Sequence, residues 1–183
     1  MTTLLIIIAL LALLVLWFIS VQRKLVSADE LCKNSMSQIG VQQNSRWDAI
    51  SSLVKLTKSY NEHEYKTLSD VIEKRREITR SSNASDVNAQ EEALNAAAAR
   101  IRLVAEQYPD LKASQTYTKT MDSLNSYENQ VRTSRMVFND TVTKYNRIVR
   151  QFPDSIVASA FRFSEREYLK EPEGKTEMPP IEI

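Results

Sequence analysis

The stretch that decides the fold is YENQVRTSRMVFNDTVTKYNRIVRQF, residues 127–152. Bulky apolar side chains recur here every three or four residues, a spacing that places them on one face of an α-helix. The same stripe extends back to residue 117, and its members are Tyr117, Met121, Leu124, Glu128, Val131, Arg135, Phe138, Val142, Tyr145, Val149 and Phe152. Two charged residues, Glu128 and Arg135, interrupt the stripe one heptad apart. The pattern therefore predicts a helix whose buried face also carries charge.

A second stripe runs through residues 26–80, which contain one glycine and no proline. Its members follow the same spacing and are Ile39, Gln43, Arg46, Ile50, Leu53, Thr57, Tyr60, Glu64, Leu68, Val71, Arg75 and Ile78. This spacing predicts one long helix that continues directly from the segment before it. Gly40 should weaken that helix by about 1 kcal/mol relative to alanine, and we interpret it as a flexible joint.

Charged residues at inward positions of both stripes predict an ionic network between helices. An unpaired buried charge costs several kcal/mol, so each such residue needs an opposite charge or hydrogen-bond partners. We expect Glu64 and Glu128 to accept from arginines, whose planar guanidinium groups favour a fixed register. The predicted structural ionic network is Arg46, Glu64, Arg75, Glu128 and Arg135. The alternative is that a stripe is drawn one position off, which leaves these groups at the edge of the bundle with their heads in water.

The composition predicts an all-α fold with almost no strand. The chain has 183 residues with only two glycines and five prolines, and residues of high helix propensity are abundant. Residues 81–86, SSNASD, read as a polar connection in which Ser85 or Asp86 caps a second helix. The inward face of that helix is expected to hold Leu94, Ala97, Ile101, Val104 and Tyr108.

Prolines divide the second half of the chain. Pro109 ends the second helix and suits the first turn of a third, which is expected from about Asp110 to Phe152. The sequence FPDS, residues 152–155, repeats this punctuation. A short and weaker fourth helix is then expected around residues 156–169.

The first 22 residues carry no charged side chain and are almost all apolar. At about 1.5 Å per residue, roughly 20 such residues cross the hydrocarbon core of a bilayer. We predict a transmembrane anchor whose marker residues are Leu4, Ile7, Leu11, Leu14, Trp17, Arg23 and Lys24. The two cations favour a cytoplasmic position for everything after the anchor. A cleaved signal peptide is the alternative, against which stand the absence of a basic start and the length of the apolar run.

The complete prediction is an N-terminal transmembrane helix followed by an antiparallel, up-and-down-like bundle of three long helices and a short fourth. The anchor takes residues 1–23, the cytoplasmic bundle takes residues 24–169, and a charged, proline-bearing tail at residues 170–183 is expected to be disordered. The segment AFRF, residues 160–163, is apolar enough to cover one end of the bundle or to present a docking patch.

Few residues favour catalysis. His63 is the only histidine, so His63-Glu64 lacks the second histidine of an H-E-x-x-H zinc site. Cys32 is the only cysteine and is expected to remain a free, inert thiol. No G-x-S-x-G sequence or glycine-rich phosphate loop occurs. With 24 basic and 23 acidic residues, the charge is too balanced for a nucleic-acid binder. We predict no enzyme activity, no cofactor, no metal and no nucleic acid.

Several separated blocks resemble the LemA family in order. They are SRWDAISSLVKLTKSYNEHEYKTLSDVIEKRREI, AEQYPDLKAS, SYENQVRTSRMVFNDTVTKYNRIVRQFP and ASAFRF. The resemblance implies one N-terminal transmembrane helix and a bundle of about four helices. It also implies polar motif positions at Arg46, Asp48, His63, Glu64, Arg75, Glu128, Asn129, Arg135, Asn139 and Asn146. Residues 36–46 depart from the family pattern, with Met36 and Gly40 at places where the family commonly differs.

The family that this chain resembles includes proteins linked to bacterial membrane remodelling, and the resemblance implies a binding role. We expect a non-enzymatic, single-pass protein of the bacterial inner membrane, acting as a scaffold or adaptor in membrane organisation or envelope stress. Its partners would be the lipid bilayer, further copies of itself in a homo-oligomer, and an unknown membrane protein. The first alternative is an adaptor for a membrane protease or sensor without homo-oligomerisation, and the second is a metal-dependent hydrolase.

Overall fold

The computed structural model describes residues 1–73 and 75–170, and within them every regular element is helical. The all-α prediction is therefore confirmed. The elements are α1 (Thr2–Thr57), α2 (Glu62–Glu73), α3 (Ala84–Gln107), α4 (Pro109–Ala113), α5 (Gln115–Arg150) and α6 (Asp154–Ala160).

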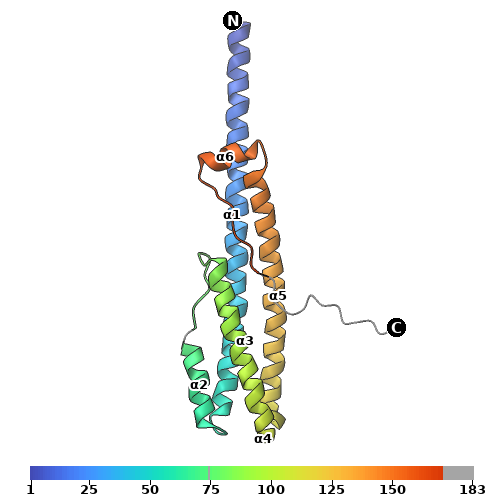
Figure 1. Cartoon of the computed structure of the whole chain (residues 1–183). Coiled ribbons are helices and arrows are strands. Elements are labelled where there is room, and N and C mark those ends of the chain that lie inside the picture. Colours follow the sequence, from blue (N-terminus) through green and yellow to red (C-terminus); the bar gives the residue numbers. More distant parts are fainter. Residues whose placement is uncertain (74, 171–183) are drawn as a thin grey trace, which may run out of the picture.

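The helices form an elongated antiparallel bundle around α1 (Figure 1). Helix α1 runs the full length of the molecule, and α5 returns beside it as its main packing partner. Helices α2 and α3 add to the half of the bundle farthest from the N-terminus, where α2 runs back along α1 and α3 runs forward again. Helix α6 lies across α1 at the other end of α5. The predicted antiparallel arrangement is confirmed.

The expected single helix through residues 26–80 is wrong, because α1 ends at Thr57 and the chain reverses into α2. Asn61 accounts for the new start, since its side-chain oxygen accepts a hydrogen bond from the backbone N–H of Glu64 at 3.1 Å. An Asn with a Glu three residues later is the sequence pattern of a capped helix start, which the unbroken stripe concealed. Residues after Thr57 therefore belong to a different helix from those before it.

Two other helix boundaries also differ from the prediction. Helix α3 is capped by Asn83, not by Ser85 or Asp86, and Asp86 instead completes a capping box by accepting from the Asn83 backbone N–H at 3.1 Å. The helix expected from about Asp110 is split, because Ser114 leaves helical geometry and caps α5 by accepting from the Tyr117 backbone N–H at 3.2 Å. In each case a short polar side chain outcompetes continuation of the helix.

The predicted apolar faces form the core, with Tyr60 and Phe152 as exposed exceptions. The buried members on α1, α3 and α5 include Ile39, Ile50, Leu53, Leu94, Ala97, Ile101, Val104, Leu124, Val131, Phe138, Val142 and Tyr145. Phe152 follows the end of α5 at Arg150, and its side chain is 76% exposed; Tyr60 follows the end of α1 at Thr57, and its side chain is 37% exposed.

Gly40 is buried and lies inside the continuous helix α1, which has no break at the position of the predicted flexible joint. The connection between α2 and α3 crosses α1 at this point. A Cβ atom on residue 40 would collide with the backbone carbonyl of Ile78. Glycine is thus required for close approach of two backbones, a use that outweighs its lower helix propensity.

The expected fourth helix also ends early. Helix α6 stops at Ala160, and Arg162 adopts the left-handed conformation (φ 59°) that turns the chain back toward the middle of the bundle. Residues 161–170, here called the return segment, contain no helix and bring Leu169 into the core. The predicted tail, residues 170–183, lies outside the described residues except for Lys170.

The first residues of α1 stand clear of the bundle (Figure 1). Side chains along this part, including Leu4, Ile7, Leu11 and Leu14, are more than half exposed although they are apolar. Within the described residues, α1 is the one helix long and apolar enough to cross a membrane. Burial of side chains begins at Trp17, and the basic pair that follows is exposed.

Candidate functional site

The most unusual site is a charged cluster inside the half of the bundle farthest from the N-terminus. Arg46 on α1 is only 1% exposed. Its Nη1 lies 3.2 Å from Glu91 Oε1 on α3, and its Nη2 lies 3.1 Å from Glu128 Oε1 on α5. Nη2 also donates to Asn95 Oδ1 at 2.7 Å. One guanidinium group therefore ties three helices together, with two carboxylates offsetting the cost of burying it.

Glu91 extends this cluster to a second buried arginine. Arg135 on α5 is 6% exposed, and its Nη1 lies 3.7 Å from Glu91 Oε2. Its Nη2 donates to Asn88 Oδ1 at 3.2 Å and to the backbone carbonyl of Lys170. Burial lowers the pKa of Arg135, and the charge of Glu91 opposes that shift. We call Arg46, Glu91, Glu128 and Arg135 the ionic layer.

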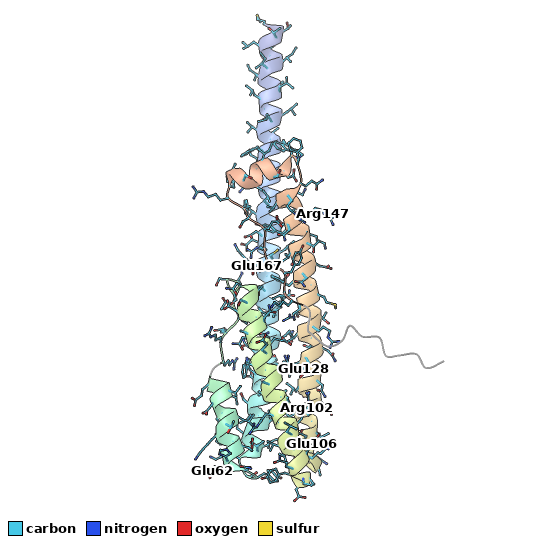
Figure 2. All side chains as sticks on the ribbon, viewed as in Figure 1. Glu62, Arg102, Glu106, Glu128, Arg147 and Glu167 are labelled. Carbon is cyan, nitrogen blue, oxygen red and sulfur yellow. The ribbon has the colours of Figure 1, made fainter. Side chains whose placement is uncertain are left out.

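The ionic layer explains the charged interruptions in the α5 stripe. Glu128 faces Arg46, and Arg135, one heptad later, faces Glu91. Residue 128 of α5 is thus an acid that faces a base on α1, and residue 135 is a base that faces an acid on α3. Arg102 adds a weaker contact from the rim, with its Nη2 3.6 Å from Glu128 Oε1 (Figure 2).

Glu91, the acid at the centre of this layer, was not predicted from the sequence. Asn88, Glu91 and Asn95 recur at intervals of three and four residues, which places them on one face of α3. That regular polar spacing was the available signal. It was hidden because the neighbouring apolar face of α3 accounts for the packing of that helix, and a polar stripe on a helix is usually solvated.

Glu64 and Arg75 lie outside the ionic layer, so their predicted place in one network with Arg46 is wrong. Glu64 accepts two hydrogen bonds from Arg100 on α3, at 2.9 and 3.0 Å, and these lower its pKa. Arg75 donates to Asp48 Oδ1 at 3.2 Å and to Asn44 Oδ1 at 2.8 Å. The break after Thr57 is the reason, because both residues follow it.

Two family-motif asparagines on α5 hold the return segment by imitating a backbone partner. Asn146 is 1% exposed, donates to the Arg166 carbonyl and accepts from the Arg166 N–H, both at 2.9 Å. Asn139 makes the same pair of bonds with Leu169, at 3.1 and 2.9 Å. A side-chain amide has the donor and acceptor that an unpaired peptide group needs. These residues therefore supply to the return segment what a neighbouring strand would supply.

Helix α1 holds the same segment through an ion pair. Arg166 donates to Asp29 Oδ1 from Nε at 3.0 Å and from Nη2 at 2.6 Å. Lys33 lies 2.9 Å from the other oxygen of Asp29. Burial acts to raise the pKa of Asp29, but the hydrogen bonds from Lys33 and Arg166 outweigh it, so the pKa of Asp29 is lowered. Nearby Cys32 is fully buried, and burial raises the pKa of its thiol.

The remaining motif residues lie on the surface. His63 on α2 and Asn129 on α5 are exposed, and so is Asp48 on α1. They come from three helices and are not gathered in one place with the ionic layer. Among the residues that the structure describes, no group of three or more His, Cys, Asp or Glu side chains is arranged to hold a metal ion.

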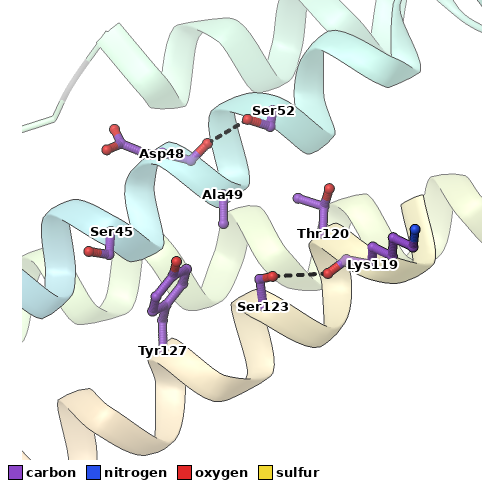
Figure 3. A pocket seen from close by; sticks show the side chains of 8 residues that line it. All are labelled: Ser45, Asp48, Ala49, Ser52, Lys119, Thr120, Ser123 and Tyr127. Atoms are coloured by element: carbon purple, nitrogen blue, oxygen red, sulfur yellow. Dashed lines mark hydrogen bonds between the residues drawn. The ribbon is translucent and has the colours of Figure 1, made fainter. Parts of the chain in front are cut away.

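A shallow groove between α1 and α5 is lined mainly by hydroxyl groups (Figure 3). Its lining residues are Ser45, Asp48, Ala49, Ser52, Lys119, Thr120, Ser123 and Tyr127. Ser52 donates to the Asp48 carbonyl at 2.9 Å, and Ser123 donates to the Lys119 carbonyl at 3.0 Å. Both hydroxyl protons are thus directed at the backbone of their own helix, so neither serine is held as a nucleophile by a base.

The polar positions described above lie mostly within the part of the chain that a family comparison recognises. The model of the LemA family matches residues 35–183. That stretch begins inside α1, after its exposed apolar part, and includes the ionic layer and the two asparagines that hold the return segment, Asn139 and Asn146.

Similarity to individual proteins covers a shorter stretch. Magnetosome proteins MamQ 1 and MamQ 2 of Paramagnetospirillum magneticum are each 33% identical to this chain over 78 residues. Magnetosome protein MamQ of Magnetospirillum gryphiswaldense is 32% identical over 78 residues. The matched stretch is 42% of this chain and 29% of each relative, so the chain spans less than a third of the relatives' length.

Proposed function

The chain belongs to the LemA family, and from this premise we propose that it acts by binding, as a membrane-anchored scaffold or adaptor, and catalyses no reaction. The observation that supports this proposal is the ionic layer. Its acids and arginines form ion pairs with one another between helices, which suits them to fixing the shape of the bundle. A catalytic carboxylate would instead need access to a substrate.

The proposed site of action is the surface of a bacterial inner membrane. The exposed apolar start of α1 would be the single span, and Arg23 with Lys24 would keep the bundle on the cytoplasmic side. The bundle would then project from the bilayer as a rod. The relatives are named for a cell structure and not for a reaction, which agrees with a role in organising a membrane.

Self-association is our preferred form of this role. Helix α5 presents two adjacent exposed apolar side chains, Met136 at 59% and Val137 at 43% exposure. An apolar pair on an outward face can serve as a contact between rods in the same membrane. The alternative is an adaptor for a membrane protease or sensor that binds the rod as a single copy.

Mass determination of the native particle after mild detergent extraction separates these forms. Self-association predicts a mass that is a multiple of 21.0 kDa, and an adaptor predicts one copy together with another protein. The double substitution Met136→Lys/Val137→Lys should reduce the multiple to one copy. Thr118→Lys, at an exposed position on the same helix about five turns from the pair, is the matched control and should leave the mass unchanged. A monomer alone from wild-type membranes would contradict both forms.

The hydrolase alternative makes a different prediction. It requires a turnover that disappears when His63, Glu64 or Glu128 is substituted while the helical circular dichroism of the protein is retained. Detection of such a turnover would overturn the proposal of a purely binding role.

A further inference from the structure

The part of α1 that stands free of the bundle is too short to cross a bilayer by itself. Side chains from Thr2 to Leu16 are all exposed, and burial begins at Trp17. This free part is roughly 22 Å long at about 1.5 Å per residue, whereas the hydrocarbon core is about 30 Å thick. A full span must therefore include the next residues of α1. Those residues are already packed against other parts of the protein.

Helix α6 is one of the elements packed there. Val157 and Ala158 on α6 form a buried cluster with Val21 and Leu25 on α1. The ring of Phe161 lies 5.6 Å, centroid to centroid, from that of Phe18. Helix α6 thus lies across α1 directly after the free part of that helix (Figure 1).

The same region exposes large apolar side chains. Phe152 is 76% exposed, Ile156 is 55% exposed and Phe161 is 48% exposed. We call these three residues, with the helix α6 that carries or adjoins them, the collar. Large apolar side chains that are exposed next to a membrane span can be buried among the acyl chains of the lipids.

The charges around the collar suit lipid headgroups. Basic residues here are Arg23, Lys24, Arg147, Arg150 and Arg162, and Figure 2 shows Arg147 at the α6 end of α5. The neighbouring acids are themselves paired with cations: Asp154 lies 3.0 Å from Lys24, and Glu165 lies 3.7 Å from Arg150. The excess of positive charge favours anionic phospholipids at the depth of the headgroups.

We propose that the collar is a second membrane contact, which inserts Phe152, Ile156 and Phe161 at the boundary between headgroups and acyl chains. The proposal rests on the anchor included in the proposed function. A single helix leaves the rod free to tilt, whereas a helix fixed across its base and seated in the interface sets the angle and height of the bundle. The collar would thereby determine which surface of the rod faces its neighbours.

Photo-crosslinking tests the contact on the unsubstituted chain. The full chain is placed in bilayers of phosphatidylcholine and phosphatidylglycerol that contain a phospholipid with a photoreactive group at the top of its acyl chain. Trypsin cleavage yields residues 151–162 as one peptide and residues 136–144 as another, because both follow an arginine and end at a basic residue. Lipid adducts are expected on peptide 151–162, at several times the level on peptide 136–144, which carries exposed Met136 and Val137. Equal or absent labelling of the two would overturn the proposal.

Spin labels then measure depth and separate failure of the collar from failure of the anchor. Labels are attached at Leu11→Cys, Phe152→Cys and Thr118→Cys, an exposed position of α5 away from Met136 and Val137, in a Cys32→Ser chain, and their relaxation by oxygen and by a water-soluble nickel complex is compared. The proposal expects residue 11 deep in the bilayer, residue 152 at the interface and residue 118 in water. A deep residue 11 with residue 152 in water would refute the collar alone. An aqueous residue 11 would refute the anchor, and residue 152 shielded from both reagents would indicate a protein contact and also refute the collar.

Discussion

The two halves of the rod solve the same packing problem with different chemistry. In the distal half, α1 and α5 are joined by α2 and α3, and the ionic layer connects α1, α3 and α5 through side-chain charges. In the half next to the N-terminus, α1 and α5 are joined by the return segment, whose backbone is held by Asn139 and Asn146. A helix satisfies its own backbone and can offer side chains, whereas an extended segment must have its peptide groups satisfied by others. Charged side chains therefore connect the helices of the distal half, and side-chain amides hold the return segment in the half next to the N-terminus.

The largest expected effect is in the distal half. Arg46→Leu would leave Glu91 and Glu128 without their shared partner inside the bundle, so we expect a loss of about 3 to 5 kcal/mol in the free energy of unfolding. Urea-induced loss of helical circular dichroism, measured on the full chain in detergent micelles, would report it.

Arg75→Leu is the matched control for that substitution. Arg75 also contacts an acid of α1, but the side chains of Arg75 and Asp48 are 37% and 73% exposed. A solvated pair of this kind contributes less than about 1 kcal/mol. Similar losses for the two arginines would remove the distinction between a buried layer and a surface pair.

Gly40→Ala should also weaken the molecule, at the junction of the two halves. Alanine improves helix propensity by about 1 kcal/mol, but its Cβ would collide with the Ile78 carbonyl, and overpacking costs about 1 to 3 kcal/mol. We expect a net loss of up to about 2 kcal/mol in the same urea measurement. A gain in stability would mean that the connection between α2 and α3 moves aside freely.

The ionic layer and Gly40 show how far the structure could be predicted from the sequence. The apolar residues before and after Arg46 follow the helical period. The spacing alone could therefore predict both the apolar core and the inward position of Arg46. Glu91 was not, because a polar stripe on α3 looks the same whether water or an arginine lies opposite. Glu64 and Arg75 were misplaced because the apolar period continues through Thr57 although the helix does not. Gly40 could not be explained from a local pattern, since its requirement comes from Ile78, far along the chain.

In the half next to the N-terminus, Asn146→Ala should loosen the return segment. The substitution leaves the partly buried N–H and carbonyl of Arg166 without their partner, which costs about 1 to 3 kcal/mol. Because Cys32 packs in the same cluster as Leu169 of that segment, its thiol should react with a maleimide several times faster in the variant. Asn129→Ala, at an exposed position of α5, should leave the rate unchanged. An unchanged rate in Asn146→Ala would show that the amide does not hold the segment.

A smaller, pH-dependent effect is expected from Asp29. Its pKa is lowered in the folded state, so its contribution is present above the unfolded pKa of about 3.9 and is lost as the pH falls through the lower folded value. Asp29→Asn should therefore be less stable than wild type at pH 7, and the difference should shrink on acidification below about pH 4. Asp122→Asn, at an exposed carboxylate of α5, is the control. A difference that is constant with pH would exclude the proposed link to ionisation.

The most direct test of the account is a double-mutant cycle between Arg46 and Glu91. Each single substitution to leucine leaves a buried charge with too few partners, whereas the double substitution removes both charges together. We predict that Arg46→Leu/Glu91→Leu is destabilised by less than the sum of the two single variants, with a coupling free energy of about 2 kcal/mol or more. Additive losses would contradict the claim that matched buried ions hold the helices of this protein in register.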